Sequence, residues 1–542
     1  MVRSTLFGQK SAPAPKPDTV NKSVGAAYSG DLKQDLISLL TTNVIGDTFY
    51  ATEQELAAST QELVTRGARE NPEFLAKAVV YGRNEGFMRL APIVGLAALT
   101  VHGGRRALTR QVFPRVIRTP DDLREYVTLF NTRAFGKRMT GWVTKMVGDW
   151  LNGLSEYHAV KYGSQASKTV TLRDILRQAH PKPASEAQDY LFNYLVKGTK
   201  EVSLTEPQQL KVIWAAERLK RATNESEVIS LITRFRLPWE VVIPALEKST
   251  PHTWAALAEV MPYFALLRNL ATMNRNGALA IPGVADMIAT KLSDPAAIAR
   301  SKLFPFRFFQ ASRKILDLPK SIQTAVSDAL ETSISNLPDI DGRMVVAVDD
   351  SGSMTSHSMG AYSDLQCRDI ARLLAAILYR RYGAKIAVFA SNAIWSRGHE
   401  GSTRVLDAMN KITPNGGSTN LGSSVQLMLR DKVPCEVYVG LTDNESYEGH
   451  GVPTILRTYR DAMKLDTRGF LVNLQPERTY QAGVNDPLIR NISGFSDQAL
   501  KFIGLQAKGG PRAQVEYVDK LDIRQYDKFV ATDTSPATVD SE

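Results

Sequence analysis

Cysteine is nearly absent from this sequence: Cys367 and Cys435 are the two residues of that type in a chain of 542 residues. The pair could form one bridge, but a disulfide framework is excluded. Such low cysteine content favours a reducing compartment. The N-terminal segment also lacks the apolar core of a secretory signal, so we expect a cytoplasmic protein.

Long hydrophobic runs are missing as well. Hydrophobic residues make up 43% of the chain, an ordinary share for a globular protein. No apolar stretch, however, approaches the roughly 18 to 20 residues that a membrane span requires. We therefore expect no membrane association. The length exceeds what one compact core accommodates and predicts two or more domains.

Familiar catalytic motifs are also lacking. The phosphate-binding pattern G-x-x-x-x-G-K-[ST] does not occur, and no Ser/His/Asp or Cys/His arrangement is recognisable. The segment "DDSGS" at 349–353 has Ser351 where a haloacid-dehalogenase phosphatase requires a second aspartate. We therefore expect no enzymatic activity.

Excess charge is missing from one part of the chain. The formal net charge is +10, yet residues 343–542 contain 23 Lys+Arg and 23 Asp+Glu. The whole positive excess therefore lies in residues 1–342. This asymmetry indicates a polyanionic partner for the N-terminal part, although a basic surface that only aids solubility would give the same count.

Helical periodicity dominates residues 31–340. Apolar residues recur at spacings of three and four in segments such as "DLKQDLISLL" and "PQQLKVIWAAERLKRA". Short amphipathic helices bury their apolar faces by stacking, so the pattern predicts a HEAT-like α-solenoid, with a multi-helix globule as the alternative. Residues 1–30, rich in Pro, Ser, Gly and Lys, predict a flexible arm. Breaks in the helical pattern fall at Asn71-Pro72, Gly103-Gly104, Thr119-Pro120, Pro181, Pro238 and Pro251.

A different pattern occupies residues 341–542. Apolar runs alternate there with helical stretches, which predicts a doubly wound α/β domain on a mainly parallel sheet. The runs expected to be strands are 344–349, 385–391, 436–443 and 468–474, and the expected helices lie near 364–382, 402–412 and 453–465.

Oxygen-bearing side chains follow three segments of this α/β part. Asp349, Ser351 and Ser353 follow the first strand, Thr419 lies in a Gly-rich loop, and Asp443 ends a later strand. In a doubly wound sheet, ligands bind beyond the carboxyl ends of the strands. Carboxylates and hydroxyls without His or Cys suit a hard divalent cation such as Mg²⁺. A loop that uses the same groups for its own hydrogen bonds, without a metal, is the alternative.

The same five positions resemble the metal-ion-dependent adhesion site of von Willebrand factor A domains, in which D-x-S-x-S is followed by a Thr and an Asp. The resemblance implies that Ser351 and Ser353 ligate the metal directly and that Thr419 does so in some states. The two aspartates would act largely through water.

Basic residues are densest between Arg105 and Arg221. The segment "FGKRMTGWVTKMVGDWLNG" at 135–153 predicts a helix that carries several of them within a few turns. Basic groups follow phosphates and aromatic rings stack on unpaired bases, so the cluster favours nucleic acid over a merely solvated face. The residues that we expect to contact RNA here are Lys137, Arg138, Lys145, Lys161, Lys168 and His180.

Three segments, 135–152, 158–185 and 261–273, resemble the TROVE module of the Ro ribonucleoprotein autoantigen family. The order of a TROVE module and a von Willebrand A domain also matches, over roughly residues 30–520. The resemblance implies a monomeric ring of HEAT-like helices. Its outer face would bind small noncoding Y-like RNA, and its central hole would bind single-stranded 3′ ends of misfolded RNA.

Residue roles follow from the same resemblance. Lys161 and His180 match the Y-RNA surface, whereas Gln165 stands where animal members usually have an arginine. Arg268 in "LLRNL" is a candidate for the hole. An exoribonuclease such as polynucleotide phosphorylase is an implied partner. The function expected is RNA quality control by a non-enzymatic scaffold. The alternative is a protein-binding scaffold whose metal captures an acidic partner residue, with RNA incidental.

Overall fold

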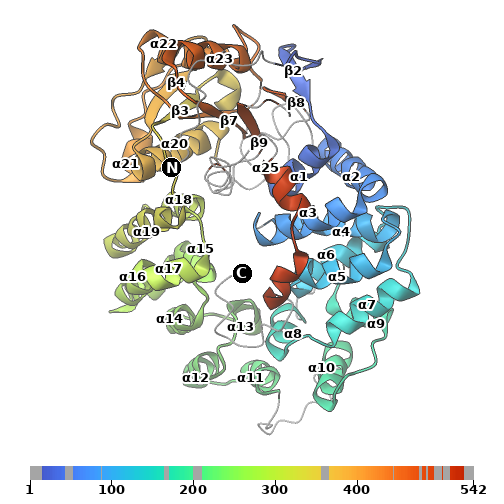
Figure 1. The fold of residues 1–542 in the computed structure, drawn as a ribbon. Coiled ribbons are helices and arrows are strands. Elements are labelled where there is room, and N and C mark those ends of the chain that lie inside the picture. The colour runs from blue at the N-terminus through green and yellow to red at the C-terminus, as the bar shows by residue number, and fades with distance from the viewer. Residues whose placement is uncertain are drawn as a thin grey trace, which may run out of the picture. The chain divides into compact units, whose positions relative to one another are not determined.

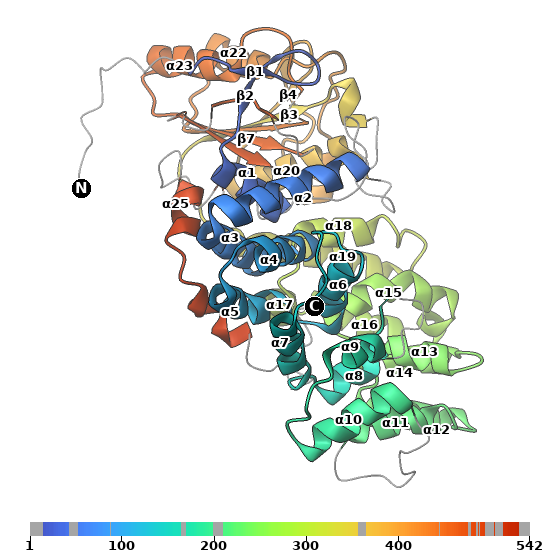
Figure 2. The same cartoon turned by 90° about the vertical axis from the view of Figure 1, so that its right-hand side faces the viewer.

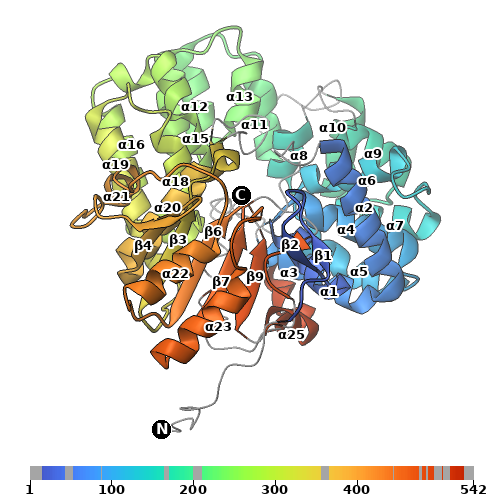
Figure 3. The same ribbon diagram turned by 90° about the horizontal axis from the view of Figure 1, so that it is seen from above.

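The computed structural model divides into two compact units. Residues 1–95 and 334–522 form the sheet unit, and residues 96–333 and 523–542 form the helical unit. Figures 1, 2 and 3 show their elements from three directions. The structure describes residues 15–42, 53–86, 88–163, 170–198, 210–355, 365–443, 445–474, 479–483, 486, 488–493, 503 and 513–529. None of the helices in these ranges combines the length and apolar character needed to cross a membrane.

The helical unit consists of short helices that pack on helices close to them in sequence, as a solenoid requires. Packed pairs include α11 with α12, α12 with α14, and α16 with α19. The helices are α4 (Leu90–His102, which begins in the sheet unit), α5 (Arg106–Val116), α6 (Pro120–Asn131), α7 (Gly141–Leu151), α8 (Glu156–Gly163), α9 (Leu172–Ala179), α10 (Glu186–Lys197), α11 (Lys211–Leu219), α12 (Glu225–Phe235), α13 (Trp239–Ala245), α14 (Pro251–Val260), α15 (Tyr263–Arg275), α16 (Val284–Ser293), α17 (Pro295–Ser301), α18 (Pro305–Ser312) and α19 (Lys320–Ser333).

Proline marks where several helices begin. The Thr119 side chain accepts a hydrogen bond from Asp122 N, and Pro120 occupies the first turn of α6. Thr250 and Pro251 start α14 in the same way. The threonine hydroxyl accepts a hydrogen bond from a backbone N–H that has no partner within the helix. Proline, which has no N–H, costs no hydrogen bond at the first helical position. The breaks predicted at these prolines are therefore confirmed as helix starts.

The strands of the α/β part form a six-stranded sheet in the order β5-β4-β3-β6-β7-β9. All pairs are parallel except β4 with β5. The chain leaves β3 toward β4 and later returns to the other side of β3 at β6, so the winding direction reverses between β3 and β6. This confirms the predicted doubly wound fold. The strands are β3 (Met344–Asp349), β4 (Lys385–Phe389), β5 (Ala393–Trp395), β6 (Val437–Thr442), β7 (Arg468–Asn473) and β9 (Ile489–Ser493).

Helices cover both faces of this sheet (Figure 2). Helices α22 (Gly422–Arg430) and α23 (Val452–Met463) lie on one face, where they share a buried core with Val345, Ala347 and Tyr438. Helix α20 (Cys367–Tyr382) lies on the other face and packs on β3 and on α21 (Val405–Asn410). All six residues of β3 are buried, as expected for a central parallel strand.

The N-terminal segment differs from the expected flexible arm. Strands β1 (Thr19–Val20) and β2 (Ala26–Ser29) form a hairpin, and β2 pairs with β8 (Thr479–Tyr480). The prediction is therefore wrong for residues 15–29, whose backbone finds partners more than 400 residues away in sequence. Residues 1–14 lie outside the described residues.

Helices from both ends of the chain also belong to the sheet unit: α1 (Leu32–Thr42), α2 (Glu53–Glu70), α3 (Pro72–Asn84) and α25 (Ala513–Asp519). Helix α1 packs on β9, where Gln34 Nε2 donates to Asn491 O at 3.4 Å. Helix α25 packs on α3, and Asp519 at its end pairs with Lys33 at 2.6 Å. The first helices therefore complete the fold that contains the last strands.

Both cysteines are free and fully buried in the sheet unit. Cys367 begins α20, and Cys435 lies just before β6. Burial is the largest of the effects that raise the pKa of the Cys435 thiol to about 12. The two thiols therefore act as apolar core groups and form no bridge with each other.

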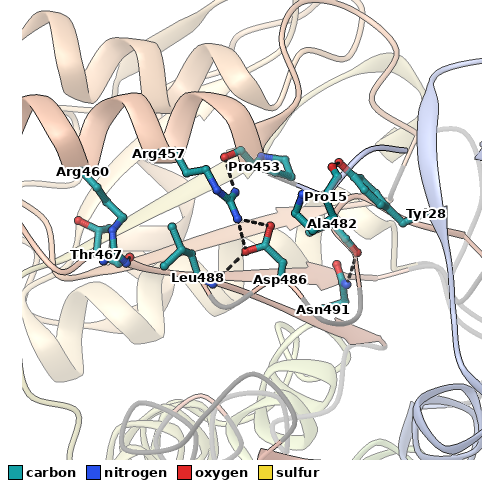
Figure 4. A network of polar contacts seen from close by, with 10 residues as sticks. All are labelled: Pro15, Tyr28, Pro453, Arg457, Arg460, Thr467, Ala482, Asp486, Leu488 and Asn491. Atoms are coloured by element: carbon teal, nitrogen blue, oxygen red, sulfur yellow. Dashed lines mark hydrogen bonds and ion pairs between the residues drawn. The ribbon is translucent and has the colours of Figure 1, made fainter. Parts of the chain in front are cut away.

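A buried ion pair fixes α23 to the chain before β9 (Figure 4). Arg457 Nη2 donates to both carboxylate oxygens of Asp486 at 2.9 Å, and Arg457 Nη1 donates to Pro453 O at 2.7 Å. Leu488 N donates to Asp486 Oδ1 at 2.9 Å. The two charged side chains are 7% and 0% exposed, so each depends on the other for compensation of its charge.

We expect Asp486→Ala to destabilise the chain strongly because it leaves the Arg457 guanidinium buried without its counterion. Loss of one partner of a buried pair typically costs about 3–5 kcal/mol. The matched control is Asp466→Ala, since Asp466 pairs with Arg460 but is 71% exposed; an exposed pair contributes about 1 kcal/mol or less. Urea unfolding of the full chain measures both, and equal losses would contradict the prediction.

Candidate functional site

The predicted metal residues lie at the carboxyl ends of β3 and β6, which are neighbours in the sheet. The parallel register pairs Val348 with Leu441, so Asp349 and Thr442 come next to each other. Thr442 Oγ1 donates to Asp349 Oδ2 at 2.7 Å. The sheet itself therefore brings the ends of two distant segments together.

The turn after β3 folds back onto Asp349. Ser351 N donates to Asp349 Oδ1 at 2.9 Å, and the Ser351 and Ser353 hydroxyl oxygens lie 3.3 Å apart. The short helix η4 (Gly352–Thr355) continues from this turn. Ser353 also hydrogen-bonds the Asp443 carboxylate. Four of the five predicted residues are therefore brought together.

Thr419, the fifth residue, is 3% exposed, and its backbone is held by the loop that follows Asp443. Its carbonyl oxygen accepts from Ser446 Oγ at 3.4 Å and from Tyr447 N at 3.3 Å. Glu448 N donates to the same oxygen at 3.3 Å. The Gly-rich loop thus packs on the loop that follows Asp443.

Asp350, the second aspartate of "DDSGS", has a different role. Its Oδ1 accepts from Arg372 Nη2 at 3.1 Å, and its Oδ2 accepts from Asn415 N at 2.7 Å. It therefore ties the turn after β3 to α20 and to the start of the Gly-rich loop that carries Thr419. Asp350 positions the loops and is not one of the predicted ligands.

Negative charge is concentrated at this point without matching positive charge. Asp349 and Asp443 are both fully buried. Burial, followed by the charge of Asp443, raises the pKa of Asp349, and burial is also the main cause of the raised pKa of Asp443, with a further contribution from the charge of Glu445. Within the described ranges, no basic side chain forms an ion pair with either aspartate.

Two buried oxygens at this point, Asp443 Oδ2 and Glu445 Oε1, have no hydrogen-bond partner among the described residues. A divalent cation would compensate them, and the donor set of carboxylates and hydroxyls suits Mg²⁺. In the part of the chain that the structure describes, no three His, Cys, Asp or Glu side chains are grouped closely enough to hold a metal. Hydroxyls would therefore have to complete the set. These residues, Asp349, Ser351, Ser353, Thr419 and Asp443, are the candidate cation site.

Glu445 is not among the residues that the sequence pattern predicts for this site. The side chain is 1% exposed, although Glu is rarely buried without compensation. Its position two residues after the strand-end Asp443 is a weak signal, because acidic residues are common in loops. What makes it notable is burial, which the sequence does not reveal.

The basic residues of the helical unit are arranged differently from the prediction. Helix α7 begins at Gly141, so Lys137 and Arg138 lie in the exposed loop before it and not on the helix. Gly136 has φ +75° there, a left-handed conformation that favours glycine. Lys145 does lie on α7, exposed, with Asp149 at 3.3 Å.

Lys161 and His180 differ in accessibility. The Lys161 side chain is 12% exposed, lies 3.9 Å from Glu240 and packs over the Tyr162 ring at 5.3 Å. His180 is exposed and ends α9 in a left-handed conformation with φ +42°. His180 is therefore accessible to a binding partner, whereas Lys161 is largely covered. Lys168 and Gln165 lie outside the described residues.

Arg268 is exposed on α15, with its guanidinium 5.5 Å from the centre of the Phe264 ring. Arg307 on α18, which the sequence analysis did not single out, lies 5.8 Å from the same ring. Two arginines therefore share one half-buried phenylalanine. The pairing was not predictable because the arginines are 39 positions apart.

Exposed basic residues at the start of α5 and in the loop before α7 form a larger cluster. Contacts between the His102 and Phe135 rings at 6.1 Å, and between Arg106 and the Trp142 ring at 5.7 Å, bring the two segments together. Neither 86–120 nor 126–148 contains an Asp or Glu. We call this cluster the basic patch; its exposed members are Arg105, Arg106, Arg133, Lys137 and Arg138.

We expect Asp350→Ala to loosen the loop that carries Thr419. The change leaves the Arg372 side chain, 15% exposed, without its counterion and Asn415 N without its acceptor. Amide hydrogen exchange over residues 413–421 should become faster, and stability should fall by about 3 kcal/mol or more. Asp407→Ala is the control, because Asp407 is an exposed partner of Lys411. Unchanged exchange in the Asp350 variant would refute the positioning role.

Comparison with known proteins agrees with this architecture. The family model described as the TROVE domain matches residues 31–351, and the model described as the Ro60 vWA domain matches residues 343–505. The chain is 22% identical over 526 residues to the "RNA-binding protein RO60" of Deinococcus radiodurans, covering 90% of this chain and 95% of that protein.

A solved structure has the same fold. It is the crystal structure of the Deinococcus radiodurans Ro (RSR) protein, with a TM-score of 0.67 and 20% identity. The match covers 88% of this chain and 99% of that one. Because the TROVE match spans more than half of the sequence and the Ro60 vWA match follows it, the chain belongs to the TROVE domain family as a bacterial-type Ro protein with a C-terminal vWA domain.

Proposed function

We propose that this chain is a non-enzymatic, cytoplasmic RNA-binding protein that uses the basic patch of its helical unit. The observation that carries the proposal is the patch itself: five exposed basic side chains from two segments without any acidic residue. Arginine forks and lysine ammonium groups bind phosphates, and Trp142 offers an aromatic face beside them. The name of the Deinococcus relative, an RNA-binding protein, supports the same assignment.

We further propose that the RNA partners are those that the family resemblance implies. Small Y-like noncoding RNA would bind the outer face that the resemblance implies, where His180 is exposed and Lys161 is largely covered by Glu240. Single-stranded 3′ ends of misfolded RNA would bind in the central hole that the resemblance implies, with Arg268 and Arg307, which both lie near the Phe264 ring, as candidates for stacking and charge. Binding both would make the protein a scaffold of RNA quality control, with an exoribonuclease such as polynucleotide phosphorylase as its partner.

We also propose that the candidate cation site holds one divalent cation, Mg²⁺ in the cell. The support is the donor chemistry together with the buried, unpartnered oxygen of Asp443. Ser351, Ser353 and Thr419 would supply neutral oxygens, and Asp349 and Asp443 would supply the negative charge. Such a cation would compensate two carboxylates that otherwise repel each other in the core.

The basic patch gives a prediction that depends on salt. Lys137→Ala with Arg138→Ala should weaken binding of a duplex RNA with a single-stranded 3′ tail and reduce the slope of log affinity against log salt by about two units. Lys411→Ala with Lys432→Ala removes the same charge from exposed positions of the sheet unit and is the control. Filter binding at several salt concentrations provides the slopes.

Equal losses in the two double variants would refute the patch as the RNA surface. RNA affinity that is independent of salt in the unaltered chain would instead favour the alternative function, a protein-binding scaffold for which RNA is incidental.

The cation site gives a second prediction. Asp349→Ala should abolish Mg²⁺ binding, because Asp349 supplies one of two charges in the ligand set and also orders the Ser351 turn. Isothermal titration calorimetry of the full chain measures the affinity, with Asp339→Ala as a control at an 88% exposed carboxylate. Equal Mg²⁺ affinity in the Asp349 variant and the unaltered chain would exclude the site.

A further inference from the structure

The turn of the N-terminal hairpin lies directly against the loop that follows Asp443. Ser23 N donates to Glu445 Oε2 at 2.8 Å, and Asn21 Nδ2 donates to Ser446 O at 3.1 Å. At Gly25 the backbones approach so closely that a Cβ would overlap the Ser446 carbonyl oxygen and lie 2.9 Å from Tyr447 Cα. The hairpin turn and the loop therefore contact each other through their backbones and through the Glu445 carboxylate.

The hairpin itself is fixed on both sides of this turn. Asn21 Oδ1 accepts from Gly25 N at 2.6 Å and closes the turn. Tyr28 on β2 pairs with Tyr480 on β8, and its hydroxyl donates to Pro15 O at 2.9 Å (Figure 4). The turn is therefore presented to the loop in one defined position.

The loop at 445–448 connects the hairpin to the candidate cation site. On one side it contacts Ser23 and Asn21, and on the other Tyr447 N and Glu448 N donate to Thr419 O at 3.3 Å. Glu445 N also donates to Asp443 Oδ1 at 3.3 Å. One short loop thus contacts the hairpin and two of the five site residues.

Glu445 is the central group of this connection. Its carboxylate is 1% exposed, accepts from Ser23 N through Oε2 and has no partner for Oε1 among the described residues. A buried carboxylate with so few donors is unfavourable unless positive charge lies nearby. A cation beside Asp443 would supply that charge without Glu445 joining the ligand set.

We propose that the N-terminal hairpin is an integral part of the cation site: it holds the loop at 445–448 through Glu445, so that cation binding and hairpin docking stabilise each other. The inference rests on the cation site proposed above. Glu445 is a positioning residue and adds negative charge near the cation. Because coupling between two equilibria is reciprocal, the cation must protect the hairpin as much as the hairpin strengthens cation binding.

Two substitutions separate charge from packing. Glu445→Gln keeps the shape and the acceptor for Ser23 N but removes the charge, and Gly25→Ala adds the methyl group that cannot fit against Ser446. Each substitution should weaken the binding of Mn²⁺ to the full chain about tenfold. A change of that size corresponds to the free energy of one charge-assisted hydrogen bond. The controls are Glu448→Gln, exposed on the same loop, and Lys22→Ala, exposed on the same turn. Calorimetry gives the affinities.

Hydrogen exchange over residues 19–29 tests the reverse direction. Mg²⁺ should slow exchange there in the unaltered chain and have no effect in Asp349→Ala, whose fold can be checked by its circular dichroism. Mn²⁺ affinity equal to that of the unaltered chain in both Glu445→Gln and Gly25→Ala would overturn the coupling and leave the cation site standing. Hydrogen exchange over residues 19–29 that does not change with Mg²⁺ would also overturn the coupling and leave the cation site standing. Failure of the unaltered chain to bind either cation would overturn the site and the coupling together.

Discussion

The parallel pairing of β3 with β6 is the constraint on which the candidate cation site depends. Both strands are wholly buried, and their register places Asp349 against Thr442 and one step from Asp443. A one-residue slip would turn every side chain of β3 to the opposite face of the sheet and separate these groups. The apolar core between β3 and α22 therefore holds the carboxylates together against their mutual repulsion.

Much of this α/β region was predictable from local pattern. The apolar run at 344–349 coincides with β3 because a central parallel strand has no polar face to interrupt it. The helix α22 was not predicted, since Gly422, Ser423 and Ser424 in its first turn have low helix propensity. Burial of Ser424, whose hydroxyl lies 2.7 Å from Tyr438 Oη, outweighs that preference.

The remaining features depend on contacts between distant parts of the chain. The composition of the first 30 residues indicates a flexible arm, yet Asn21 and Ser23 find hydrogen-bond partners at Ser446 and Glu445. Lys161 looks like a free cation in the sequence but is covered by Glu240, 79 positions later. Conversely, the basic patch exists because an aromatic contact from His102 to Phe135 joins two segments. Local periodicity contains no information about such pairs.

The buried cysteines have a practical consequence. Cys367 and Cys435 are both shielded by the core of the sheet unit, and only a thiolate reacts readily with maleimides. A fluorophore could therefore be attached at a cysteine introduced on the surface without first removing the native ones. The unaltered chain would be the control for background labelling. Any label that it acquired would report transient exposure of Cys367 or Cys435.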